Sequence, residues 1–440
     1  MRHTGSLASS LLEQEGRALL TRLDQVRPFV LHETMTLAAA LPFHAQLEIE
    51  RFLHAGREAL RRQVHDYLRW IRGPGATQSP AEQQRRFVLI RLQFNAVLSQ
   101  FDLFTEVVTQ RSEHQTGVWL SGLDSLAEDS LRIKGMPYRP PPVVCYLARG
   151  PGAAIRRART RLPGGAVNPV AIIRVPRERM IGHGIASSLV HEVGHQAAAL
   201  LGVVDSLKPL LDRRARDAAP ADRAAWASWS RWISEIVADF WSVGKLGVAS
   251  TLGLFAVVSL PRFFVFRPSV DDPHPTPYVR VLVSASIGRS LYPHTQWDSV
   301  ASTWKRLYPT AGLEPASLAE IAALERTMPA FVEVLASHRP AALNGRSLRE
   351  VMPIGERTPA QLLGKFKAWR CDLGTMARQP PSLVFAAVGQ ARSASWISPE
   401  VESRLLTSLL QAWAVRSSLR PARRVTVTPP IAHNTLRSIA

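Results

Sequence analysis

An apolar, proline-free segment at residues 184–201 restricts the fold more than any other part of the chain; it reads GIASSLVHEVGHQAAALL. This pattern predicts one helix, and residues four apart on a helix lie one turn apart on the same face. His191 and His195 can therefore present two imidazoles to one metal ion, and Glu192 can reach a water molecule beside it. A similar start at His32 (HETM) lacks the second histidine.

A buried helix with two hydrogen-bonded histidines is the alternative interpretation of this segment. Gly194 argues mildly against it, because a glycine costs up to about 1 kcal/mol inside a helix. Its presence indicates that something needs room at this position. We therefore favour a metal site on the predicted helix.

A catalytic zinc site with three protein ligands needs one more donor, with a position left for water. Forty residues after His195, a second helical pattern (WISEIVADFW) carries Glu235 and Asp239 on one face. Two acids on an apolar helix are costly to bury unless charged partners meet them. We expect Glu235 to bind the metal and Asp239 to accept an imidazole N–H from a ligand histidine. A solvated pair of acids at the outer edge of this helix is the alternative.

The combination of HEVGH with EIVAD resembles the gluzincin zinc metallopeptidases, in which a Glu on a second helix is the third zinc ligand. Residues 272–281 (DPHPTPYVRV) resemble the HP…R element of the HtpX-type and CAAX-prenyl-protease-like family. The three elements together span about residues 170–290. This resemblance implies a zinc peptidase without the membrane spans of the familiar members, since no convincing span is evident here.

Three residues of the HP…R element are candidates for stabilising the oxyanion that forms during hydrolysis: His274 first, then Tyr278 and Arg280. The alternative for Arg280 is a structural salt bridge, and for His274 a plain loop position. The short apolar run at 170–175 could border the cleft and pair with an extended peptide by edge addition.

Helical patterns dominate the rest of the chain. Residues 45–71 and 81–111 have helical spacing of their apolar residues, and Ser398-Pro399 opens another helix. Short β-branched runs at 143–147 and 170–175 predict strands just before the metal motif. We expect a surface loop in the polar, basic stretch at 212–223.

These patterns predict a mainly α (α+β) fold, with a helical metallopeptidase core, a small sheet before the HExxH helix and helical flanks. Residues 1–135 form the N-terminal helical region and 136–300 the metallopeptidase-like core. Residues 301–440 form a C-terminal helical region with a loose basic tail from Arg420.

Composition bounds the partners and the compartment. The net charge is +19, but 48 of the 54 basic residues are arginine, and no recognition helix, zinc finger or basic strip with interleaved aromatics is evident. The two cysteines, Cys145 and Cys371, offer neither a disulfide framework nor a metal knuckle. The longest apolar stretch, 246–260, is shorter than the roughly 20 residues of a membrane span, and the N-terminus lacks a signal-peptide core. We therefore predict a cytoplasmic protein.

The sequence thus predicts a zinc-dependent metallohydrolase, a peptidase that cleaves peptide or protein substrates, with Zn2+ as cofactor and Glu192 as general base. One alternative is a non-catalytic helical interaction protein with a retained metal or pseudo-active site. Another is a basic binder of nucleic acid or anionic surfaces. Zinc content separates the first two from the third, Glu192→Gln separates the first from the second, and the oligomeric state stays open.

Overall fold

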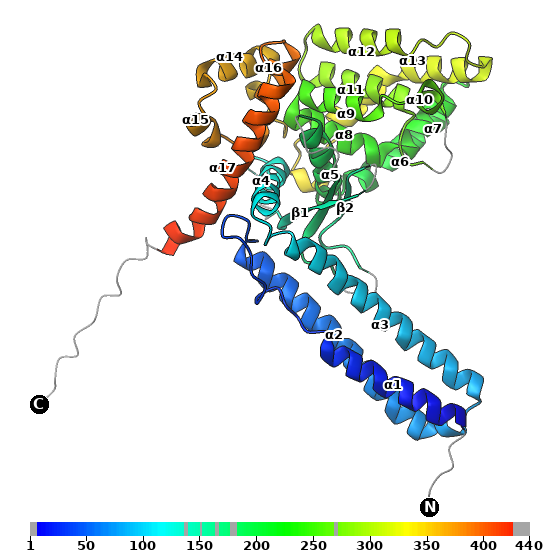
Figure 1. Ribbon diagram of the computed structural model, residues 1–440. Helices are drawn as coiled ribbons and strands as arrows, with labels where there is room; N and C mark the ends of the chain where they lie inside the picture. The colour runs from blue at the N-terminus through cyan, green and yellow to red at the C-terminus, as the bar shows by residue number, and fades with distance from the viewer. Residues whose placement is uncertain are drawn as a thin grey trace, which may run out of the picture.

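The computed structural model describes residues 7–135, 140–149, 152–162, 167–176, 183–267 and 272–425. Within these ranges the chain forms 17 α-helices and one three-stranded sheet, so the predicted mainly α fold is confirmed. A long helical arm projects from a larger helical body, and the sheet lies where the two meet (Figure 1).

The arm consists of three antiparallel helices, α1 (Leu7–Gln25), α2 (Phe43–Arg72) and α3 (Pro80–Thr109), with a short 3-10 turn η1 (Pro74–Thr77). Ser79 caps the start of α3, because its hydroxyl accepts a hydrogen bond from the Glu82 N–H at 3.3 Å. The predicted helices at 45–71 and 81–111 are confirmed to within two residues at each end.

By length and composition, α3 is the one described helix that could cross a membrane, and 33% of its most apolar stretch is buried. A core helix of a protein without any membrane segment passes the same test, so this evidence for a span is weak. The described part of the chain therefore has no clear membrane span, in agreement with the sequence prediction. The cytoplasmic location stays a prediction.

The sheet has the strand order β1-β3-β2, built from β1 (Val143–Ala148), β2 (Ala154–Arg156) and β3 (Ala171–Pro176). β1 runs parallel and β2 antiparallel to the central strand β3. The two predicted strands are confirmed, whereas β2 was missed because it is short and carries no run of apolar residues. The suggestion that 170–175 pairs with a peptide is wrong, since both edges of β3 are already paired.

The two faces of the sheet belong to two hydrophobic cores. Tyr146 and Ile172 pack with the arm helices, whereas Cys145 and Ile173 pack with the body, as strand alternation requires. α4 (His114–Leu131) packs in the body core against the sheet and α17, although it lies within the predicted N-terminal region. The division at 135 and 300 stays a prediction.

The HExxH helix α5 lies at the centre of the body, packed against α4, α8 and α9. The helices around it are α5 (His183–Leu201), α6 (Val203–Asp217), α7 (Arg223–Arg231), α8 (Ile233–Leu246), α9 (Val248–Val258), α10 (Arg262–Phe266), α11 (Pro277–Leu291), α12 (Gln296–Leu307) and α13 (Pro315–Ser337). The C-terminal part contains η3 (Ala341–Leu343), η4 (Ile354–Glu356), α14 (Pro359–Trp369), α15 (Leu373–Ala377), α16 (Pro381–Ser393) and α17 (Pro399–Val425).

Two sequence expectations about irregular segments need correction. The stretch 212–223 is not simply a loop, because α6 continues to Asp217: buried Leu207 and Leu211 hold one face of this helix in the core while its arginines lie on the outer part. The tail does not become irregular at Arg420, because α17 continues to Val425. The rest of the predicted loose tail lies outside the described residues.

Gly194 allows α5 and α8 to approach each other closely beside the histidines. A Cβ at this position would lie 2.7 Å from Cα of Ala238 and 3.0 Å from Cβ of Trp241. The room that the sequence indicated at Gly194 is therefore taken by the backbone of α8.

The Gly194→Ala substitution should push the two helices apart. We expect the free energy of unfolding to fall by about 1–3 kcal/mol, as for other overpacked cores, and zinc binding to weaken. Denaturant unfolding and zinc titration measure both effects. Gly184→Ala on the same helix is the control, because no described atom lies within 4 Å of the added Cβ; equal losses in the two variants would contradict this account.

Candidate metal centre

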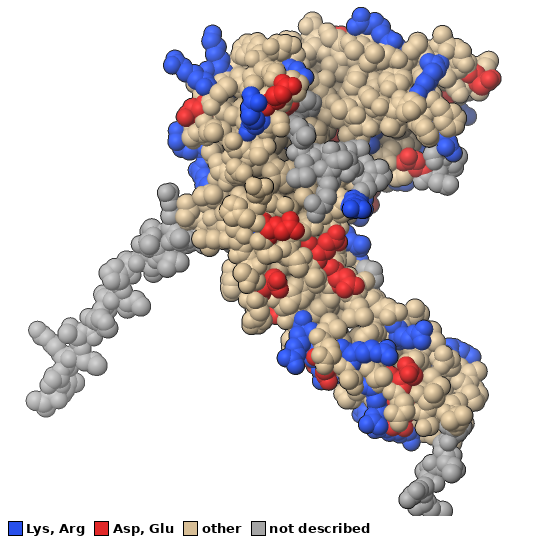
Figure 2. Space-filling view, viewed as in Figure 1, with Lys and Arg blue, Asp and Glu red and all other residues tan. Residues whose placement is uncertain are grey.

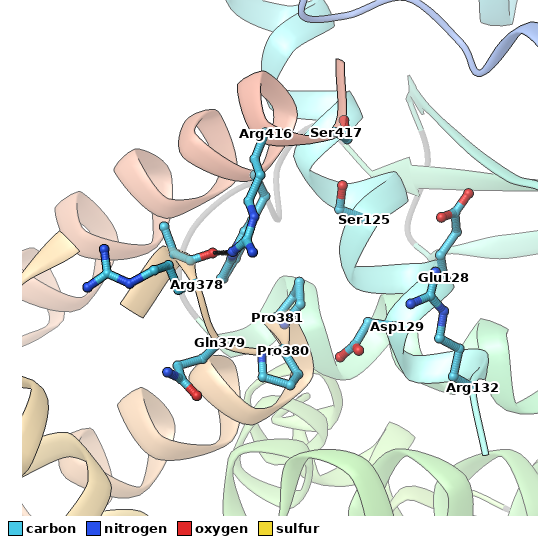
Figure 3. Close-up of a pocket in the computed structure, with 12 residues that line it drawn as sticks. Ser125, Glu128, Asp129, Arg132, Arg378, Gln379, Pro380, Pro381, Arg416 and Ser417 are labelled. Atoms are coloured by element: carbon cyan, nitrogen blue, oxygen red, sulfur yellow. Dashed lines mark hydrogen bonds between the residues drawn. The ribbon is translucent and has the colours of Figure 1, made fainter. Parts of the chain in front are cut away.

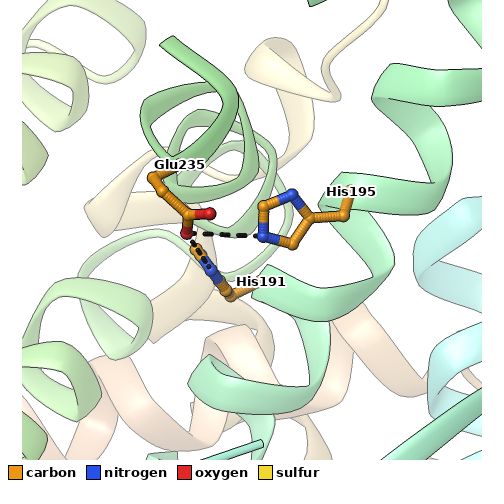
Figure 4. A group of neighbouring side chains, drawn as sticks. All are labelled: His191, His195 and Glu235. Carbon is orange, nitrogen blue, oxygen red and sulfur yellow. Dashed lines mark ion pairs between the residues drawn. The ribbon is translucent and has the colours of Figure 1, made fainter. Parts of the chain in front are cut away.

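His191 and His195 on α5 point toward Glu235 on α8 (Figure 4). Their ligand atoms all lie within 4.8 Å of one another. Oε2 of Glu235 is 3.2 Å from Nε2 of His191 and 3.4 Å from Nε2 of His195. Ligands held about 2.0–2.1 Å from a tetrahedral zinc ion lie about 3.4 Å apart, so these separations fit such an ion.

The three side chains are largely withdrawn from solvent. Oε2 of Glu235 is buried and has no partner of good hydrogen-bond geometry among the described residues, although imidazole nitrogens surround it. Two imidazoles and one carboxylate are a donor set that zinc accepts, with a fourth position left over. The residues therefore fit a zinc site with three protein ligands.

The charges in this cluster favour a cation. Burial opposes ionisation of Glu235, but the three imidazoles close to its carboxylate (His191, His195 and His274) outweigh the effect of burial and hold the pKa of that carboxyl well below its usual range. Burial also opposes the protonated His191 ring, yet the charge and hydrogen bond of Asp239 raise the pKa of His191 to about 9. The negative field that retains a proton here equally favours a metal ion.

Asp239 lies one turn after Glu235 and orients the first histidine. Its Oδ1 is 2.8 Å from Nδ1 of His191, which leaves Nε2 of that ring facing Glu235. Arg280 on α11 holds the other side of this carboxylate, with Nε 2.8 Å from Oδ2 and Nη2 2.9 Å from Oδ1. Asp239 thus occupies the supporting position that the sequence predicted, and its neighbour Arg280 forms the salt bridge considered as the alternative.

Replacing Asp239 by Asn should weaken zinc binding about 10–100-fold, because a ligand histidine loses the acceptor that fixes its ring. Competition with a chromophoric chelator measures the zinc dissociation constant. Asp298→Asn changes an exposed carboxylate paired with Arg289 and is the matched control. An unchanged dissociation constant in the Asp239 variant would remove this residue from the site.

A cavity of about 200 Å³ lies beside the metal cluster, and His191 is the one candidate ligand that lines it. Glu192 is 8% exposed and lines this cavity beside His191. The other walls come from segments far apart in the sequence, namely Gly152, Ala153, Ser187, Ser188, Asp239, Leu254, Val257, His274 and Arg280.

The three oxyanion candidates have different surroundings. Nε2 of His274 is 2.9 Å from Oε2 of Glu235, its Nδ1 is 2.6 Å from Asp272, and the side chain is 38% exposed at the cavity wall. Arg280 also reaches the cavity, but Asp239 binds its guanidinium. Tyr278 is not brought to the cluster, because its hydroxyl faces Glu325 at 3.5 Å.

Sequence reasoning missed some residues of this site. Asp272 accepts from both the backbone N–H and the ring of His274 and so fixes the loop before α11. An Asp two residues before a His is a weak Asx-turn signal that could have indicated this contact. Gly152 and Ala153 carried no signal, since the path of the chain alone brings them to the cavity.

The chain was compared with protein-family models, curated proteins and solved structures, and none of them matches. The gluzincin resemblance therefore stays an expectation from the motif residues.

Proposed function

We propose that the protein is a zinc-dependent metallopeptidase. The observation that supports this most strongly is the convergence of the ligand atoms of His191, His195 and Glu235 within 4.8 Å, at a cavity that Glu192 lines. A buried carboxylate beside a three-ligand metal cluster with an open position is typical of hydrolases that activate water.

When bound, zinc would act as a Lewis acid that polarises a carbonyl oxygen and lowers the pKa of a water molecule to about 7. Glu192 takes the proton from the attacking water and then delivers it to the leaving amine, so its carboxylate ends as it began. Nε2 of His274, which contacts Oε2 of Glu235 in the described structure, would exchange that contact for a hydrogen bond to the carbonyl oxygen as negative charge develops there. Asp239 and Arg280 keep the His191 ring in place throughout.

An extended peptide is the substrate form that suits the walls of the cavity. β2 is an edge strand of the described sheet, and Gly152 and Ala153 just before it line the cavity. A peptide that adds to the outer edge of β2 would pass beside the metal cluster. Leu254 and Val257 on α9 offer it an apolar wall.

His274→Ala should keep zinc and lower kcat about 10²–10³-fold, the usual effect of losing one oxyanion donor. Steady-state kinetics and metal analysis of the same preparation measure both quantities. His294→Ala, an exposed histidine after α11, is the matched control. A loss of zinc in the His274 variant would instead make this residue a ligand.

The direct test of the function uses an unbiased pool of peptides and mass spectrometry of the new termini. We expect cleavage by the zinc-loaded protein, no cleavage after zinc is removed with a chelator, and recovery when zinc is returned. A protein with stoichiometric zinc and no chelator-sensitive cleavage would support the non-catalytic interaction protein instead.

On the face that Figure 2 shows, the basic side chains are not arranged as the nucleic-acid alternative requires. On the face shown in Figure 2, Lys and Arg are spread over both the body and the arm, with acidic side chains between them and gathered where the arm meets the body. A binder of polyanions usually gathers its basic residues on one face or along one groove. The high net charge alone therefore carries no second proposal.

A further inference from the structure

A second cavity, of about 790 Å³, lies at the other end of the helix that carries Glu235. Lys245 in its wall is ten residues after Glu235 on α8, about 15 Å along the helix axis. The C-terminal ends of α4 and α8, the N-terminal end of α16 and the segment 346–357 enclose it. This cavity is therefore separate from the metal centre.

Two buried cations line this cavity. Lys245 is 5% exposed and Arg357 is 6% exposed. Nζ of Lys245 donates to the Arg132 carbonyl at 2.6 Å, while Arg357 donates to the Lys245 carbonyl and, at 2.9 Å, to the Ser382 hydroxyl. Each cation thus holds the C-terminal end of a helix, but among the described residues neither forms an ion pair, and Nε of Arg357 is buried without a partner.

Three acidic residues line the same cavity, namely Asp129, Glu350 and Glu356, against five basic ones. Two of the three are engaged elsewhere. Oδ2 of Asp129 accepts from the backbone N–H of Ser382 at 2.9 Å and from its hydroxyl at 2.6 Å. Glu350 pairs at 3.0 Å with Arg339, which does not line the cavity. Further basic residues lie around the rim, namely Arg132, Lys134 and Arg346. Positive charge therefore exceeds negative charge in and around this cavity.

Figure 3 shows a smaller hollow of about 210 Å³ next to this cavity. Asp129, Arg132 and Pro380 line both, so they form the partition between the two. Arg416 lines the smaller hollow and donates a hydrogen bond to the Ala377 carbonyl at 2.8 Å. The smaller hollow also has much less volume than the larger cavity. The larger cavity alone has a volume typical of sites for small molecules.

Two like charges in a buried place are unfavourable unless an anion compensates them. Burial, and then the charge of Arg357, lower the pKa of Lys245 to about 7. A bound anion would raise the pKa of Lys245 again, because its negative charge stabilises the protonated amine. A guanidinium and an ammonium together, beside the N-terminal end of a helix, are donors that suit the tetrahedral oxygens of a phosphate group.

We propose that this cavity binds the phosphate group of a small molecule, with Lys245 and Arg357 as its principal cationic contacts. Arg132, Lys134 and Arg346 at the rim attract the anion and contact the rest of it. The site does not depend on the peptidase activity, because it uses none of the residues of the metal centre.

Calorimetric titration of the full-length, zinc-loaded protein with inorganic phosphate, at constant ionic strength set with chloride, tests this proposal. We expect one saturable site, and we expect Lys245→Met and Arg357→Gln each to weaken binding at least about tenfold. Lys367→Met, an exposed lysine on α14, is the matched control and should bind phosphate normally. Glycerol 1-phosphate in a parallel titration distinguishes a phosphate ester, which binds as well or better, from the free ion.

Phosphate can also bind zinc, so the titration is repeated on the His191→Ala protein, which should give the same dissociation constant. Loss of binding in that variant, no saturable heat in the unaltered protein, or equal affinity in both cavity variants and the control would each overturn the proposal. If Arg357→Gln fails to fold, Lys245→Met decides, since methionine keeps most of the side-chain volume. Phosphate should also raise the thermal midpoint of the unaltered chain and not of Lys245→Met.

Discussion

A Glu192→Gln protein is expected to bind zinc as tightly as the unaltered chain and to hydrolyse peptides about 10²–10⁴-fold more slowly. Gln keeps the size of the side chain but cannot take a proton from water at neutral pH. Glu192 is 8% exposed and lines the cavity beside His191. Among the described residues that line this cavity, its carboxylate is the one that neither belongs to the proposed ligand set nor contacts a ligand. The substitution therefore removes the proposed general base.

The measurement pairs kcat on a cleaved peptide with the zinc content of the same sample. Glu48→Gln, an exposed glutamate on the arm, is the control and should change neither. Unchanged turnover in the Glu192 variant would exclude this residue as the base. Loss of zinc from the Glu192 variant would mean that this residue helps to bind the metal and is not the general base.

The His195→Ala substitution removes one of three ligands. It should therefore weaken zinc binding by more than the roughly 10–100-fold expected when a supporting residue is replaced. Zinc that binds only the folded chain adds about 2.7 kcal/mol to the free energy of unfolding at 100 times its dissociation constant. We therefore expect zinc to raise the thermal midpoint of the unaltered protein and to leave that of the variant unchanged.

Equilibrium dialysis and thermal unfolding with and without zinc measure these effects. His32→Ala is the matched control, since this exposed histidine begins an incomplete version of the same motif on the arm. Equal zinc binding by the His195 and His32 variants would contradict the proposed ligand set.

The sequence predicted the parts of the site that depend on one helix. Four-residue spacing placed His191 with His195, and Glu235 with Asp239, on shared faces before any fold was known. The same geometry could have separated Tyr278 from Arg280, because residues two apart on a helix point in nearly opposite directions. The resemblance had grouped them, and the structure turns Tyr278 toward Glu325 instead.

The parts that the sequence could not predict depend on contacts between distant segments. β2 has three residues and gains its partner only from the path of the chain around β3. The basic end of α6 has the composition of a surface loop. It is helical because Leu207 and Leu211 on the same helix are buried in the core, and the sequence alone does not show that burial. Gly194 carried a signal that something lies close, but which helix fills that room became evident only from the packing of α5 on α8.

X-ray absorption at the zinc K-edge of the purified, zinc-loaded protein tests the central claim most directly. The account predicts two imidazole nitrogens, with the characteristic outer-shell scattering of their rings, and carboxylate or water oxygen, all at about 2.0–2.2 Å. A chain that does not take up zinc, or a spectrum without imidazole scattering or with sulfur at about 2.3 Å, would contradict the assignment of His191, His195 and Glu235 as the ligands.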